Sequence, residues 1–206
     1  MKNEVVIVAF GDSLTVGYQS PTLGEEFPRP APYTEFLDAM TKRFKQGSAN
    51  VTKVEFLNMG IVGELTDDML DRFESDVVRL GPDFVIVLGG SNDLGWGVEP
   101  EAVAGNLKEM YGQALNHDIT PIACTVPSVL GYDEGIPPRI MLNRLIRRYS
   151  TELDLTCVGL FEATSDSAGR LREEYSNDGL HMTAEGYERI AEVIFLEAVR
   201  SIVLGS

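Results

Sequence analysis

A serine, an aspartate and a histidine far apart in this chain have the chemistry of a nucleophile, an orienting group and a base. Ser13 follows Gly11-Asp12 directly after an apolar run at the N-terminal end, and Asp178 stands three residues before His181 near the other end. A serine hydroxyl attacks a carbonyl carbon once a base takes its proton, an imidazole titrates near neutral pH, and a carboxylate orients that imidazole. These residues predict acyl transfer, provided that the fold brings both ends of the chain together.

Some of these residues also have ordinary structural interpretations. The run Gly-Asp-Ser before Leu14 is typical of a helix start, where Ser13 would be the N-cap. The second histidine, His117, lies between Asn116 and Asp118 at a predicted helix end. An exposed imidazole there is favourable to the helix dipole, and we expect no catalytic part for it.

Two further polar segments lie between the ends, each directly after an apolar run. They read Asn58-Met59-Gly60-Ile61-Val62-Gly63 and Gly90-Ser91-Asn92-Asp93. With the motifs around Ser13 and His181, they make four motifs in an order and at spacings that resemble the SGNH hydrolases, also called the GDSL esterase and lipase family. The resemblance extends from Val5 to about Ala198, which is nearly the whole chain.

The resemblance implies donors for the oxyanion that develops during acyl transfer. They are the backbone N–H of Ser13, the backbone N–H of a glycine in the second motif, and the side chain of Asn92. The family has Gly-Asp-Thr at that glycine, and Gly63-Glu64-Leu65-Thr66 fits it best, with Glu for Asp and a leucine inserted. A turn that requires positive φ is the structural alternative for either glycine. We assign Gly63 as the donor and expect Gly60 to be the turn glycine. Asn92 is also a good turn residue, and its position after the third predicted strand favours the donor role.

Four other residues are expected near the site. Asp12 should hydrogen-bond nearby loop amides and hold Ser13, and Asp93 should act similarly. Trp96 and Tyr132, in predicted loops, are candidates to line an acyl pocket or a sugar platform, and ordinary packing explains them equally well. We expect no metal and no cofactor, because the chain has no His or Cys cluster and no phosphate-binding glycine pattern. The G-x-S-x-G signature of another hydrolase fold is also absent.

Length and composition limit the possible partners. A chain of 206 residues suits a single domain, 1–206, and 44% hydrophobic with 24% charged residues is ordinary for a soluble protein. The net charge of −15 repels nucleic acid and anionic bilayers, although solubility is the simplest reason for it. A small-molecule ester is compatible with that charge, whereas nucleic acid is not expected as a partner. The oligomeric state stays open.

The N-terminal residues give an expectation for localisation, and the cysteines give one for their own state. No signal peptide precedes the first apolar run and no stretch is long enough to span a membrane, so we expect a cytoplasmic protein unless a leader has been removed. Cys124 and Cys157 lie in apolar runs. We expect buried free thiols rather than a disulfide or a metal pair.

Strand-like runs alternate with helical patterns along the chain. The nearly continuous apolar runs at 5–10, 54–58, 84–88, 120–125 and 155–159 are typical of parallel strands buried on both faces. Helical stripes occur within 33–44, 69–77, 107–115, 142–149 and 187–202. The alternation predicts an α/β fold, a three-layer α/β/α sandwich with a five-stranded parallel sheet of flavodoxin-like plan. Its active groups should lie at the carboxyl ends of the strands, where three of the four motifs begin.

The function expected from these observations is that of a serine esterase that hydrolyses short-chain carboxylic esters through an acyl-serine intermediate. Within the same family, a carbohydrate O-acetylesterase, a lysophospholipase and a thioesterase are alternatives. A catalytically silent binding protein on the same fold is an alternative of another kind, although no catalytic residue is missing. A flavodoxin-type nucleotide binder would need a phosphate-binding loop that the sequence lacks.

Overall fold

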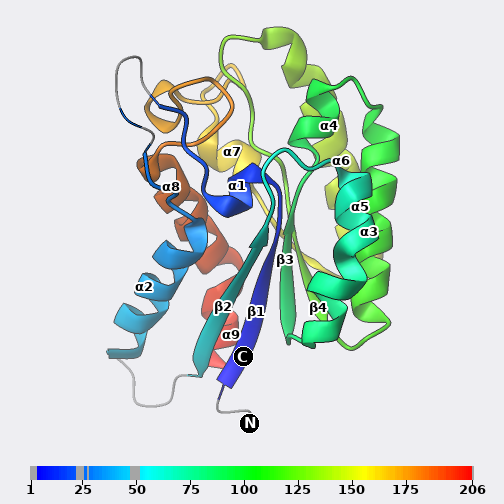
Figure 1. Ribbon diagram of the computed structural model, residues 1–206, viewed down its shortest axis with the longest axis vertical. Helices are drawn as coiled ribbons and strands as arrows, with labels where there is room; N and C mark the ends of the chain where they lie inside the picture. The colour runs from blue at the N-terminus through cyan, green and yellow to red at the C-terminus, as the bar shows by residue number, and fades with distance from the viewer. Residues whose placement is uncertain (1–3, 22–25, 27, 47–51, 206) are drawn as a thin grey trace.

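The computed structural model describes residues 4–21, 26, 28–46 and 52–205, and its helices lie on both sides of a central sheet (Figure 1).

Five parallel strands form the sheet in the spatial order β2-β1-β3-β4-β5. Their bounds are β1 Glu4–Gly11, β2 Lys53–Gly60, β3 Phe84–Leu88, β4 Thr120–Cys124 and β5 Thr156–Val158. All five predicted strands are confirmed, and each end lies within two residues of its prediction. Most apolar residues of β1 and β3 are buried because helices cover both faces, which explains why their runs show no polar alternation.

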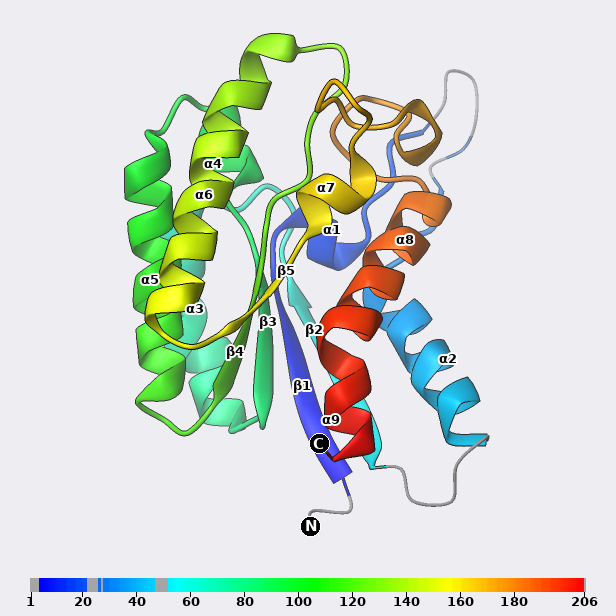
Figure 2. The ribbon, with the colours of Figure 1, turned by 180° about the vertical axis from the view of Figure 1, so that it is seen from behind.

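Long helices make the two outer layers. Helices α2, α8 and α9 cover one face, and α3, α5 and α6 cover the other (Figures 1 and 2). Their bounds are α2 Tyr33–Gln46, α3 Thr66–Asp76, α5 Pro100–Leu115, α6 Ile136–Glu152, α8 Ala184–Ile194 and α9 Arg200–Leu204. The predicted stripes lie on these helices, because their apolar side chains pack against the sheet or a neighbouring helix.

The last predicted stripe is one helical run with an irregular centre. Helices α8 and α9 are joined by a π-helical segment, Phe195–Val199, so the run continues from Ala184 to Leu204 without a break. The sequence pattern predicts a continuous helix here and does not reveal the wider turn.

Short helices lie at the carboxyl edge of the sheet. No helical periodicity predicts them, and only the first has a sequence signal, the helix-start pattern before Leu14. They are α1 Ser13–Val16 after β1, α4 Ser91–Gly95 after β3 and α7 Leu160–Thr164 after β5. Three 3₁₀ turns, at Val78–Leu80, Asp133–Gly135 and Glu173–Tyr175, complete the described elements. The edge that carries α1, α4 and α7 is the one where the predicted motifs begin (Figure 2).

Both cysteines are free thiols, as expected. Cys124 is buried in β4 and Cys157 is half-buried in β5. None of the helices in the described part of the chain is long and apolar enough to cross a bilayer.

Candidate active site

Ser13 lies at the abrupt turn from β1 into α1. The N-cap of α1 is Asp12, whose Oδ1 accepts a hydrogen bond of 2.9 Å from the Leu14 amide. The interpretation of Ser13 as the N-cap is therefore wrong, because the preceding aspartate occupies that position and Ser13 is the first residue of the helix. The Ser13 hydroxyl is consequently not needed for capping.

The Asp12 carboxyl is unusual because it is buried. Desolvation raises the pKa of Asp12 to about 7, and the carboxylates of Asp93 and Glu64 add to that rise, whereas the Leu14 amide and His181 oppose it. Asp12 thus holds the first turn of α1, as expected for a supporting residue, while its charge changes near neutral pH.

Asp178 and His181 form a hydrogen-bonded pair. The His181 Nδ1 donates to Asp178 Oδ2 at 2.7 Å. The other carboxylate oxygen accepts from the backbone amides of Leu180 and His181 at 2.9 and 2.7 Å. Although partial burial opposes ionisation, hydrogen bonds from His181, Ser20 and these amides hold the pKa of Asp178 well below its usual range. The pair therefore has a charged carboxylate on Nδ1, which leaves Nε2 to act as the base.

The loop that carries this pair is closed by its own contacts. Ser176 Oγ accepts from the Gly179 amide at 2.9 Å and donates to the His181 carbonyl at 2.6 Å. Gly179 has φ +85°, and a Cβ there would lie 2.2 Å from the Leu130 carbonyl oxygen. The Leu130 amide donates to the Gly179 carbonyl at 2.8 Å, so the segment after β4 anchors the loop.

Contacts between the two ends of the chain bring Ser13 and His181 to one edge. The Tyr187 hydroxyl donates to the Tyr18 carbonyl at 2.6 Å and lies 3.5 Å from the Ser13 carbonyl. The rings of Tyr18 and His181 meet edge to face, with centroids 4.6 Å apart. Ser20 Oγ donates to Asp178 Oδ2, the oxygen that also accepts from His181. Both ribbon views show the chain after α1 beside the loop before α8 (Figures 1 and 2).

The predicted oxyanion donors lie on neighbouring segments of the same edge. Asn92 Nδ2 donates to the Glu64 carbonyl at 2.9 Å, and because an amide has two N–H bonds, the second can serve a ligand. Gly63 is exposed and has φ +81°, and no described atom lies within 4 Å of the position that a Cβ would take there. Both residues are thus compatible with the donor roles expected for them.

The sequence matches the GDSL-like lipase/acylhydrolase family over residues 9–189. That span includes all four motifs and every site residue described above. This chain belongs to the GDSL-like lipase/acylhydrolase family.

Solved structures that are similar to this chain have the same fold. The lipase/acylhydrolase of Enterococcus faecalis is 24% identical, with a TM-score of 0.74 over 98% of this chain and 96% of that one. The acetylxylan esterase Axe2 of Geobacillus stearothermophilus is 20% identical, with a TM-score of 0.75 over 94% of this chain and 93% of that one. The "uncharacterized lipoprotein YqeF" of Bacillus subtilis is 30% identical over 132 residues, 61% of this chain and 50% of that protein. The present chain therefore matches about half the length of that curated relative.

The structure of this GDSL-family site corrects the prediction for Gly60 and changes the one for Asp93. Gly60 does not have positive φ, so its interpretation as a turn glycine is wrong. It ends β2, and a Cβ there would lie 2.5 Å from the Val16 amide nitrogen, so close approach of α1 requires glycine. Asp93 accepts from the Thr66 amide at 3.0 Å and from its hydroxyl at 2.6 Å, and so supports the start of α3 rather than Ser13.

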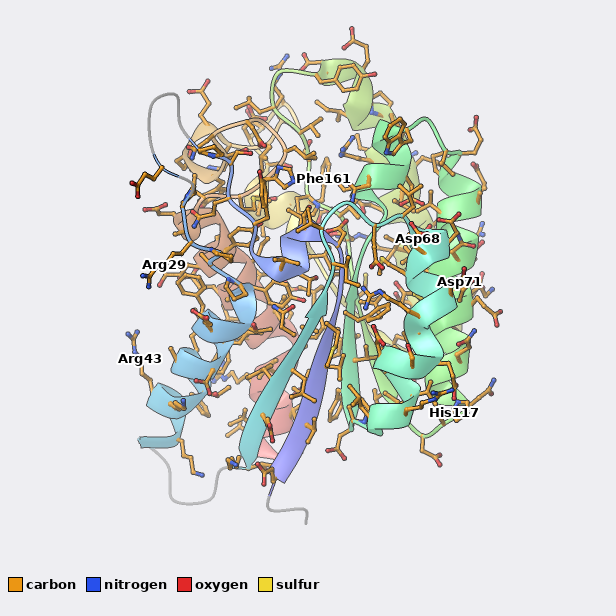
Figure 3. The ribbon with its side chains drawn as sticks, viewed as in Figure 1. Arg29, Arg43, Asp68, Asp71, His117 and Phe161 are labelled. Atoms are coloured by element: carbon orange, nitrogen blue, oxygen red, sulfur yellow. The ribbon has the colours of Figure 1, made fainter. Side chains whose placement is uncertain are left out.

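The remaining predicted residues are two exposed aromatic side chains and a histidine far from the site. Trp96 ends α4 with 81% of its surface exposed, and Tyr132 precedes a 3₁₀ turn with 58% exposed. Both stay candidates for substrate contact. His117 lies beyond the C-terminal end of α5, at the opposite end of the molecule from the motifs (Figure 3). Its Nδ1 lies 2.8 Å from the Gln113 carbonyl of its own helix.

Sequence reasoning missed Tyr18, Ser20 and Tyr187, which join the two ends of the chain, and Ser176, which holds together the loop of Asp178 and His181. Only Tyr187 carried a signal, because a tyrosine in a strongly apolar stripe must find a partner for its hydroxyl once buried. For metals, the part of the chain that the structure describes contains no group of three or more His, Cys, Asp or Glu side chains that could hold an ion.

Proposed function

We propose that this protein is a serine esterase that hydrolyses carboxylic esters with short acyl chains. The observation that carries the proposal is the 2.7 Å bond between His181 Nδ1 and Asp178 Oδ2, on a loop that Tyr18 and Ser20 hold against the segment following α1, the helix that begins at Ser13. Membership of the acylhydrolase family supports the reaction class, and the short acyl chain follows from the open groove that the family resemblance implies.

In the proposed mechanism, Ser13 Oγ attacks the ester carbonyl carbon while His181 Nε2 takes the hydroxyl proton. Asp178 stabilises the imidazolium through Nδ1. The carbonyl oxygen becomes an oxyanion and accepts hydrogen bonds from the Ser13 and Gly63 amides and from Asn92 Nδ2. His181 then gives its proton to the leaving alcohol, and the C–O bond to the alcohol breaks. Water, deprotonated by His181, attacks the acyl-serine and releases the carboxylic acid.

The test combines a panel of ester substrates, covalent labelling of the nucleophile and a comparison of two histidine variants. The wild type should hydrolyse p-nitrophenyl acetate and butyrate, and Ser13→Ala should abolish this with little change in Tm. Diisopropyl fluorophosphate should add one adduct on Ser13, seen by mass spectrometry. His181→Ala should lower kcat by several orders of magnitude, whereas His117→Ala should be close to neutral. Labelling at another serine, or equal losses for the two histidine variants, would contradict the assignment.

A carbohydrate O-acetylesterase is the second candidate. The exposed rings of Trp96, next to α4, and Tyr132, in the segment after β4, favour it, because an aromatic ring that faces solvent can stack on a sugar. Acetylated xylo-oligosaccharides compared with p-nitrophenyl acetate distinguish the two. A much higher kcat/KM for the sugar, lost in Trp96→Ala or Tyr132→Ala, would favour the second candidate.

A further inference from the structure

Arg72, on α3, is a nearly buried arginine with an unusually complete set of partners. Its side chain is 13% exposed, and that of its partner Glu64 is 11% exposed. Arg72 Nε donates to the two Glu64 carboxylate oxygens at 2.7 and 2.9 Å, and Nη1 donates to Asp76 at 2.9 Å. The guanidinium also lies 4.1 Å above the Phe10 ring. Two carboxylates compensate its charge, so Arg72 is not a free cation for a substrate.

The same guanidinium joins the two chain segments that carry the backbone oxyanion donors. Arg72 Nη2 donates to the Gly11 carbonyl at 3.1 Å and also bonds to Glu64. Gly11 is two residues before Ser13, and Glu64 directly follows Gly63. One planar group therefore links the segment of the first donor with the segment of the second. A planar, bidentate fork fixes orientation as well as distance.

Glu64 also makes contact with the third donor. Its carbonyl accepts the Asn92 Nδ2 hydrogen bond at 2.9 Å, while its carboxylate is held by Arg72. In the loop before it, Ile61, Val62 and Gly63 are all exposed, and the Ile61 amide donates to the Gly11 carbonyl at 3.0 Å, the same oxygen that Arg72 contacts. The position of Gly63 is thus set by its neighbours, and Glu64 is the neighbour with a fixed side chain.

We propose that Arg72 and Glu64 are positioning residues that hold the three donors of the oxyanion hole at their working separations. This rests on the proposed esterase function. Neither residue touches the reacting atoms. They act through Gly63 and Asn92, and a displacement of a donor by about 1 Å is enough to slow catalysis substantially.

The decisive variant is Glu64→Ala. Arg72 keeps Asp76 as a partner in this variant, so no buried charge is left alone and the protein should fold. We expect kcat for p-nitrophenyl acetate to fall by about 10- to 100-fold, less than the roughly 10²–10³ for complete loss of one donor. KM should stay within about twofold, because the donors tighten mainly in the transition state. Glu64→Gln, which keeps an acceptor for Arg72, should recover part of the loss. Arg72→Gln should behave as Glu64→Ala, if it folds.

Two readouts separate positioning from a merely structural role. In an Asn92→Ala background, Glu64→Ala should cost a smaller factor in kcat than in the wild type, because part of its effect passes through Asn92. The rate at which diisopropyl fluorophosphate labels Ser13 should fall with kcat, because the phosphoryl oxygen occupies the same hole. Arg79→Gln is the matched control, since Arg79 makes an exposed pair with Glu74 at 3.9 Å next to the same helix. It should leave both rates unchanged.

Four outcomes contradict the positioning role, the proposed function or both. Wild-type rates in folded Glu64→Ala, or losses that multiply fully with Asn92→Ala, overturn the positioning role. A wild type that labels at Ser13 but hydrolyses no ester overturns the proposed function, and the labelling rates still test the positioning role. A wild type that does neither overturns both.

Discussion

At the scale of single residues, Asn92 has two candidate roles, oxyanion donor and turn residue, which predict different effects of mutation. One of its N–H groups is used by the Glu64 carbonyl, so the side chain is held in place before any substrate arrives. Fixed donors are effective because they need no reorganisation when the negative charge develops. A donor of this kind should be revealed by its kinetics rather than by its contribution to stability.

We expect Asn92→Ala to lower kcat by about 10²–10³ with little change in KM. Asn92→Asp should be at least as damaging, because it places a carboxylate where the oxyanion develops and next to the Glu64 carbonyl. The measurement is kcat, KM and Tm for both variants. An active Asn92→Asp variant would exclude the oxyanion role and favour a turn.

Asp12 gives a prediction about pH. Its pKa is raised from 3.8 to about 7 in the folded protein, so folding favours the neutral carboxyl. The resulting contribution to stability is complete below about pH 4 and is lost as the pH rises towards 7, at about 1.4 kcal/mol per pKa unit. Asparagine caps a helix equally well and does not titrate. Asp12→Asn should therefore become more stable relative to the wild type between about pH 4 and pH 8, as measured by urea unfolding. A difference that does not change with pH would contradict the shift.

At the scale of elements, the strands were predictable and the short helices were not. A buried parallel strand leaves a continuous apolar run in the sequence, and β3 was predicted with its observed ends, Phe84–Leu88. Helices α1, α4 and α7 have four or five residues each, which is too short for a helical period to show. The tight approach at Gly60 is equally invisible in the sequence, because it depends on a segment distant along the chain.

Gly179, in the loop that carries Asp178 and His181, can be compared with Gly131, which follows Leu130 in the segment that contacts this loop. Both have positive φ, +85° and +79°. A Cβ at Gly179 would lie 2.2 Å from the Leu130 carbonyl oxygen, whereas no described atom lies within 4 Å of the Cβ position at Gly131. Gly131→Ala should cost about 1–2 kcal/mol for the left-handed conformation alone. Gly179→Ala should cost more and should also lower kcat, because it pushes the loop away from Leu130. Unfolding free energies and kcat for both variants check this, and equal behaviour would show that the contact is unimportant.

At the scale of the whole molecule, the net charge of −15 should act on the rate at which substrates arrive. A strongly negative field repels anions, and salt screens it over a Debye length of about 10 Å at 0.1 M. Raising ionic strength should therefore increase kcat/KM for an ester that carries a carboxylate, such as mono-p-nitrophenyl succinate. The neutral p-nitrophenyl acetate is the control and should change little. A parallel response of both substrates would point to a salt effect on the enzyme itself.

The sequence located the proposed reacting groups but not what holds them together. Ser13, Asp178 and His181 stand in recognisable motifs, whereas Ser20 and Arg72 stand in none. Ser20 meets Asp178 across 158 positions, and Arg72 meets Gly11 across 61. Such contacts depend on the order of strands in the sheet, which residue types and local periodicity do not specify.

Tyr187, which links the two ends of the chain, also affects when activity can arise during protein synthesis. Tyr187 is synthesised 174 positions after Ser13. Until the segment that carries Asp178, His181 and Tyr187 has been made and docked, the nascent protein has the proposed nucleophile without its proposed base. Under the proposed mechanism, a ribosome-bound chain that ends before Asp178 hydrolyses no ester, and recovery of activity during refolding reports the arrival of α8 rather than the formation of the sheet.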